Sequence, residues 1–151
     1  MQINIQADGV SNVRQKLKTI ADKLRDMRQL WGAVGMYIQR QTIKERFDKE
    51  QSPNGQKWKP LSKATINHRK KCNKSGNIKI LQDTGELRRS IAYEAGANYA
   101  RVGTALKYAK THQFGRGNIP ARPFLGVNDE EKRHINSMIS AYIKKNILGG
   151  G

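Results

Sequence analysis

The longest regular pattern in the sequence is a row of apolar residues near its N-terminus. The spacing alternates strictly between four and three positions, and the row consists of Val13, Leu17, Ile20, Leu24, Met27, Trp31, Val34 and Ile38. Because this spacing places them along one side of an α-helix, it predicts a long amphipathic helix, capped at Ser11 or Asn12 and continuing to about Phe47. Gly32 and Gly35 each weaken a helix by about 1 kcal/mol relative to alanine, so a kink or a division is expected there.

The length of this helix leaves two interpretations of the apolar row open. At about 1.5 Å per residue, an unbroken helix would span on the order of 50 Å. Such a helix extends beyond a compact domain of this size, so it either bends or packs on neighbouring subunits. Short heptad patterns most often belong to the core of their own domain. The row is therefore a core helix or a contact between subunits.

Two further regions predict strands. Residues 3–7 alternate between apolar and polar, which indicates a short strand with one buried face. Residues 91–95 and 99–103 flank the turn residues Gly96, Ala97 and Asn98. A turn of this composition between two such segments predicts an antiparallel hairpin.

Several short helices are predicted from their ends. Ser62 can cap one helix, and Asp83 can form a capping box with Glu86 at the start of another. Thr104 can begin a helix of one or two turns that Gly115 ends. The sequence from residue 119 to residue 124 holds two prolines and is expected to be extended.

The last helix is predicted to begin at Asn128. The carboxylates at 129–131 lie in its first turn, where they interact favourably with the positive end of the helix dipole. Its apolar stripe consists of Ile135, Met138, Ile139 and Tyr142. We therefore expect an α+β fold, in which a long N-terminal helix and a C-terminal helix pack with a small, mainly antiparallel sheet. Residues 1–148 are expected to form a single domain, and the glycines at 149–151 a flexible tail.

Charge is the strongest compositional signal. The 151 residues include 29 Lys and Arg against 12 Asp and Glu, a formal net charge of +17. The segment between Gln51 and Gln82 has no acid, and its basic residues are Lys57, Lys59, Lys63, Arg69, Lys70, Lys71, Lys74 and Lys79. This basic segment is either a solvated surface that keeps the protein soluble or a patch that contacts DNA or an acidic protein. Any DNA contact would be to the phosphate backbone, since no base-reading motif is present.

The sequence offers no catalytic or metal-binding set. Cys72 is the single cysteine, which excludes an intramolecular disulfide and favours a reducing compartment. His68 and Cys72 have a spacing that could bind zinc, but no second pair completes a site. Acids are scarce, and the cluster at 129–131 is explained by helix capping. We therefore expect no enzyme activity and no cofactor or metal. We also expect no membrane span and no signal peptide, and thus a soluble, cytoplasmic product.

Four motifs in a fixed order resemble a known family. They are SPNGQKWKPLS, ILQDTGELRRSI, RVGT followed by KYAKTHQFG, and IPARPFLG before the final helix. Together they are similar to the virion morphogenesis or tail-completion proteins of long-tailed phages, including Mu-like and P2-like phages. The resemblance covers nearly the whole chain, most clearly from Phe47 to Tyr142.

The resemblance implies a structural, non-enzymatic role at the neck or the head-proximal end of the tail. It implies a homo-oligomeric ring, expected to be a hexamer, that touches connector or portal and tail terminator or tail tube proteins. The protein would be made in the host cytoplasm and end in the virion. The motif residues carried over are Thr84, Gly85, Leu87, Gly103, Tyr108, Ala109, His112, Phe114, Gly115, Pro120, Arg122, Pro123 and Phe124. Phe114 and Phe124 are expected to be core anchors.

Other roles of these residues stay open. His112 and Arg122 are candidates for contacts between subunits, although Arg122 could instead form an internal ion pair or clamp backbone carbonyls. The basic segment would face either the packaged DNA or an acidic protein surface. The competing hypotheses are a sequence-independent basic DNA-binding protein and, far behind it, a basic protein that acts on RNA.

Overall fold

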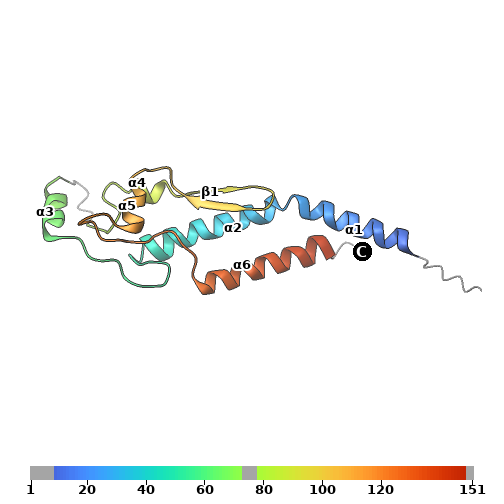
Figure 1. Cartoon of the computed structure of the whole chain (residues 1–151). Coiled ribbons are helices and arrows are strands. Elements are labelled where there is room, and N and C mark those ends of the chain that lie inside the picture. The colour runs from blue at the N-terminus through green and yellow to red at the C-terminus, as the bar shows by residue number, and fades with distance from the viewer. Residues whose placement is uncertain (1–8, 73–77, 149–151) are drawn as a thin grey trace, which may run out of the picture.

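The computed structural model describes residues 9–72 and 78–148 and confirms the α+β fold (Figure 1). Its elements are α1 (Val10–Arg25), α2 (Arg28–Gln41), the π-helical η1 (Thr42–Phe47), α3 (Lys63–Cys72), α4 (Glu86–Arg89), β1 (Ala92–Ala95), β2 (Ala100–Gly103), α5 (Ala109–Phe114), α6 (Asp129–Tyr142) and the π-helical η2 (Ile143–Leu148). The predicted strand at residues 3–7, the tail at 149–151 and most of the loop after Cys72 lie outside the described residues.

Helix α2 forms the middle layer of the molecule. It packs on the antiparallel β1–β2 hairpin on one side and on α6 on another (Figure 1). In the predicted hairpin, Ala92 pairs with Gly103 and Ala95 with Ala100. Gly35 makes the close approach to the hairpin, because a Cβ atom at this position would lie 2.7 Å from the Tyr93 ring. The glycine that weakens the helix is therefore required by packing.

The N-terminal helix is divided, but not where its glycines predicted. Asp26 is extended (φ −134°, ψ 94°) and separates α1 from α2, while Gly32 and Gly35 lie inside α2. The hairpin turn contacts the chain at this break, because the Met27 amide donates a hydrogen bond to the Ala97 carbonyl at 2.8 Å. The end near Phe47 is confirmed.

The two helices on either side of this break differ in burial. Helix α2 buries Leu30, Val34 and Gly35. Helix α1 has no buried residue and packs on η2 (Figure 1). Val13 is 58% exposed and Leu17 is 60% exposed. The core interpretation of the apolar row is thus correct for α2 and wrong for α1.

The hydrophobic core lies at the opposite end of the molecule from α1. The Phe47 ring contacts the rings of Trp58 and Phe124, with centroids 5.7 and 5.6 Å away. The Trp58 indole donates to the Pro123 carbonyl at 2.9 Å, which satisfies its polar atom on burial. The cluster of buried residues consists of Phe47, Trp58, Ile80, Leu81, Leu87, Ile91, Ala109 and Phe124. Four segments far apart in the sequence thereby meet in one core.

The predicted helix ends were confirmed in part. Ser62 accepts the Thr65 amide at 3.1 Å at the start of α3, and Asn128 forms a full capping box with Glu131 in α6. The capping box predicted at Asp83 is wrong, because Gly85 in a left-handed conformation occupies the cap position of α4. Helix α5 begins at Ala109 rather than Thr104.

Within residues 9–72 and 78–148, no helix is long and apolar enough to span a membrane.

Candidate functional site

Six of the motif residues line one groove beside the core, which we call the motif groove. They are Thr84, Gly85, Leu87, Tyr108, His112 and Arg122. The groove has a volume of about 440 Å³, and α3, the α4 turn, α5 and the segment after α5 contribute to it. Leu61, Leu81 and Ile119 add apolar surface to its wall. Motifs separated by more than thirty positions in the sequence thus form one surface.

Gly85 shapes the turn at one side of the motif groove. Its φ of +73° lies in the left-handed region that favours glycine. The guanidinium of Arg89 folds back over this turn, where Nη2 donates to the Thr84 carbonyl at 3.0 Å. A Cβ atom at Gly85 would lie 2.7 Å from Arg89 Nη1. A side chain at this position would therefore strain the backbone and displace the arginine.

Two backbone carbonyls hold Arg122 in the wall of the motif groove. Its Nε donates to the Lys59 carbonyl at 2.8 Å, and its Nη2 donates to the Pro60 carbonyl at 3.1 Å. The side chain is 7% exposed, and burial together with the charge of Arg69 lowers the pKa of Arg122. The carbonyl clamp considered from the sequence is thus the arrangement present. It joins the SPNGQKWKPLS motif to the IPARPFLG motif.

His112 also lines the motif groove, with its Nδ1 buried and without a hydrogen-bond partner among the described residues. Its ring stacks edge-on against Tyr108 at a centroid distance of 5.9 Å. Burial is the main cause that lowers the pKa of His112 below its usual 6.5, and the positive charges of Arg122 and Arg69 lower it further. The imidazole is therefore neutral at pH 7. Burial and a hydrogen bond to Glu86 raise the pKa of Tyr108.

Gln113 positions the extended segment after the groove and was missed from the sequence. Its Oε1 accepts the amides of Phe124 and Leu125, both at 3.0 Å, and its Nε2 donates to the Leu125 carbonyl at 2.9 Å. These three bonds replace the partner that a neighbouring strand would provide. The only sequence signal was its place inside the KYAKTHQFG motif. Gly115 ends α5 with a φ of +77°, as predicted.

The remaining motif residues do not line the groove. Phe124 is fully buried and anchors the core, as predicted. Phe114 is 71% exposed, so its prediction as a core anchor is wrong. The reason is that α5 turns Ala109 inward and leaves its last residue at the surface. Gly103 is the last residue of β2 and pairs with Ala92, at the end of the hairpin away from its turn.

Four of the eight residues of the basic segment lie on α3, and they do not all face solvent. Lys63, Lys70 and Lys71 are exposed on α3. Arg69 instead turns inward, where it pairs with Asp83 at 3.4 Å and donates to the Lys79 carbonyl. The remaining lysines are Lys57, whose Nζ donates to the Lys49 carbonyl at 2.6 Å, the exposed Lys59 and Lys79, and Lys74, which lies outside the described residues. Three of the exposed basic residues of this segment thus lie together on α3, at the end of the molecule opposite α1 (Figure 1).

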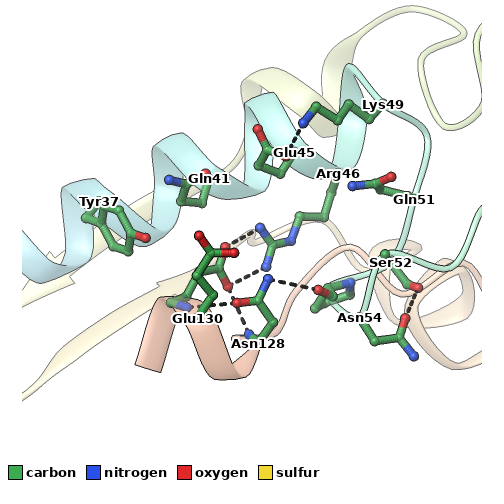
Figure 2. Close-up of a pocket in the computed structure, with 13 residues that line it drawn as sticks. Tyr37, Gln41, Glu45, Arg46, Lys49, Gln51, Ser52, Asn54, Asn128 and Glu130 are labelled. Carbon is green, nitrogen blue, oxygen red and sulfur yellow. Dashed lines mark hydrogen bonds and ion pairs between the residues drawn. The ribbon is translucent and has the colours of Figure 1, made fainter. Parts of the chain in front are cut away.

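A second, polar pocket surrounds an ion pair that joins η1 to α6 (Figure 2). The guanidinium of Arg46 donates to both carboxylate oxygens of Glu131 and to the Gly126 carbonyl. The two side chains are only 1% and 7% exposed. Capping therefore explains only part of the role of Glu131. Sequence reasoning did not single out Arg46, since the two residues are 85 positions apart.

Among residues 9–72 and 78–148, no three His, Cys, Asp or Glu side chains are grouped so that they could hold a metal ion. His68 Nδ1 and Cys72 Sγ approach to 3.9 Å on the exposed side of α3. The polar groups of the motif groove mostly bond to backbone carbonyls or to one another. The groove thus combines apolar side chains with charged groups of both signs that make contacts within the subunit.

Comparison with known proteins gives the chain its family. The model of the phage virion morphogenesis family matches residues 8–144, which include α1, the motif groove and most of α6–η2. The chain belongs to the phage virion morphogenesis family. It is therefore a structural or assembly protein of phage virion morphogenesis, associated with the virion, and the resemblance stated from the motifs is confirmed.

Curated relatives of this family agree. The chain is 32% identical to Mu-like prophage FluMu G protein 1 of Haemophilus influenzae over 140 residues, which cover 93% of this chain and 94% of the relative. It is 28% identical to the putative capsid assembly protein G of Escherichia phage Mu over 104 residues, 62% of this chain and 65% of the relative. No solved structure matches the chain.

Proposed function

We propose that this protein completes the tail and joins head to tail, as a subunit of a ring around the DNA passage at the neck. The ring is a homo-oligomer, proposed to be a hexamer. Its neighbours are the connector or portal on one side and the tail terminator or tail tube on the other. The protein is made in the host cytoplasm and then enters the virion. No enzymatic step is part of this role.

The exposed side chain of Phe114 is the observation that carries this proposal. It belongs to the motif that marks the family resemblance, yet it is 71% exposed in the single chain. Exposed aromatic side chains are enriched in contacts between proteins, where they supply large apolar area. The ring gives Phe114 a burial site that the isolated subunit does not offer. The family match over residues 8–144 supports the same conclusion.

A matched pair of variants tests the ring. Phe114→Ala removes exposed apolar area, so it should leave the free energy of unfolding within about 0.5 kcal/mol of the parent. Phe124→Ala opens a cavity in the core and should lower that free energy by about 3–5 kcal/mol. Light scattering should show that the parent protein forms a ring of defined mass, and that Phe114→Ala shifts it to smaller species.

Two results would reject the ring. One is a parent protein that remains monomeric at the concentrations reached in an infected cell. The other is a phage deleted for this gene that still produces filled heads joined to normal tails in electron micrographs.

Sequence-independent DNA binding is the second candidate function. It is favoured by the net charge of +17 and by the exposed lysines of α3. It predicts retardation of duplex DNA at low salt and a steep loss of affinity as salt rises. Replacing Lys63, Lys70 and Lys71 with glutamine should weaken retardation more than replacing Lys16, Lys18 and Lys23 on α1. Equal loss from both triple variants would mean a diffuse charge effect, and no retardation would eliminate the candidate.

A further inference from the structure

The apolar side of α1 is mostly exposed in the described chain. It consists of Val10, Val13, Leu17, Ile20 and Leu24, which we call the α1 stripe. Four of these side chains are between 41% and 60% exposed, and Ile20 is half-buried. At about 1.5 Å per residue, the stripe is about 21 Å long. A row of this kind on one helix exceeds the scattered apolar residues that a protein surface normally shows.

The rest of the described chain covers only part of α1. Helix α1 packs on η2, which ends at Leu148. In Figure 1 the N-terminal half of α1 extends beyond the end of the C-terminal helix. Val13 and Leu17, in that half, are the most exposed members of the stripe.

The spacing of the stripe selects a helix as its occupant. The intervals of three, four, three and four residues assign Val10, Leu17 and Leu24 to heptad position a, and Val13 and Ile20 to position d. A row of a and d residues is narrower than the apolar face of an ordinary core helix and fits the knobs-into-holes contact with one other helix. A partner helix of about two heptads would match its length of about 21 Å.

The charges beside the stripe indicate which charge the partner helix should carry next to its apolar residues. Positions e and g flank the contact, and their charged residues on α1 are Arg14, Lys16 and Lys23, all basic. The single acid of α1, Asp22, lies on the far side and pairs with Arg25 at 3.4 Å. Two α1 helices side by side would bring lysine against lysine or arginine, which disfavours self-pairing.

We propose that the α1 stripe binds an acidic amphipathic helix of a different protein. The partner carries apolar residues at its a and d positions and Glu or Asp at its e and g positions. This contact goes beyond the ring, since it joins two different proteins and does not depend on how copies of this chain associate. It also gives the basic charge of α1 a specific use, in partner choice.

Two peptides of about three heptads test the proposal by titration against the whole protein. Both carry Ile at a and Leu at d; one carries Glu at e and g, and the other carries Lys. The Glu peptide should bind, and the Lys peptide should not. Leu17→Asp should weaken binding of the Glu peptide by about tenfold or more, equivalent to about 1.4 kcal/mol, while circular dichroism shows an unchanged fold.

A charge exchange provides the matched control. Reversing the flanking residues, with Lys16→Glu and Lys23→Glu, should transfer binding from the Glu peptide to the Lys peptide. Reversing two basic residues on the outer side, with Lys18→Glu and Arg25→Glu, changes the net charge equally and should leave the preference for the Glu peptide unchanged. Equal effects from the two double variants would overturn the proposal, since they would reduce the contact to net charge.

Light scattering and one truncation separate the other occupants. If neither peptide binds and Leu17→Asp dissociates an oligomer, a second copy of this chain covers the stripe. If the Glu peptide binds only after residues 1–8 are deleted, that segment covers it. If neither peptide binds and the mass does not change, the stripe has no helical partner. Each of these three results overturns the proposal. The effect of Phe114→Ala on the mass of the oligomer is measured separately and tests the ring by itself.

Discussion

Helices α1 and α2 carry one continuous apolar row but use it in different ways. In α2 the row faces the β1–β2 hairpin and α6, and Val34 is 2% exposed. In α1 the same spacing continues, and Leu17 is 60% exposed. The ion pairs differ in the same direction. Arg46 in η1 and its partner Glu131 in the first turn of α6 are buried, whereas Asp22 and Arg25 on α1 are exposed.

The difference teaches that a heptad pattern predicts a contact along one side of a helix. It does not predict whether the partner belongs to the same chain or to another one. The half of the row near the core finds its partner in its own chain. The other half extends past the core, and its apolar side chains stay mostly exposed in the described chain.

The ion pairs give the largest expected contrast. Glu131→Gln keeps a side chain that can complete the capping box with Asn128 but leaves the Arg46 charge buried without its partner. We expect a loss of about 3–5 kcal/mol in the free energy of unfolding. Asp22→Asn removes an exposed pair and should cost no more than about 1 kcal/mol. Urea unfolding measures both, and equal losses would remove the contrast between the helices.

A pair of leucines tests the same contrast without charge. Leu30 in α2 is 4% exposed, and Leu17 in α1 is 60% exposed. Leu30→Ala should lower the free energy of unfolding by about 2–5 kcal/mol, whereas Leu17→Ala should stay within about 0.5 kcal/mol. Both changes have the same small effect on helix propensity. A loss above about 2 kcal/mol for Leu17→Ala would show that α1 is part of the folded core.

Lowering the pH should reduce the free energy of unfolding through His112, by less than the substitutions above. Its pKa in the folded protein is below 6.5, so the unfolded chain binds more protons as the pH falls through 6.5. The stability that neutral His112 provides is therefore complete above pH 6.5 and is lost progressively below it. His112→Gln should reduce the slope of unfolding free energy against pH in this range, compared with the parent. An unchanged slope would mean that the imidazole is not held neutral by its surroundings.

Local signals in the sequence predicted the local structure well. Asn128 begins α6, Gly115 ends α5, and the turn at 96–98 joins the two strands, because each depends on residues adjacent in the chain. The break at Asp26 was missed for the opposite reason. It depends on a hydrogen bond from Met27 to Ala97, a contact that becomes visible only when the chain is folded.

The motif groove shows the same division between local and long-range information. The motif residues were identified from the sequence, and the position of Phe124 in the core was predicted correctly. The role of Gln113 depends on the extended segment that follows α5, and the role of Arg46 depends on a helix 85 residues later. Phe114 was placed in the core because its residue type favours burial. Its exposure in the single chain carries information that composition could not supply.

The most direct test of the division between α1 and α2 is the yield of infectious particles from a phage whose copy of this gene carries Leu17→Asp. The purified variant must first be shown to unfold at the same temperature as the parent. We predict that the titre falls to that of a gene deletion, because the subunit folds but cannot make its contact. A normal titre from this folded variant would contradict the assignment of the α1 stripe to assembly.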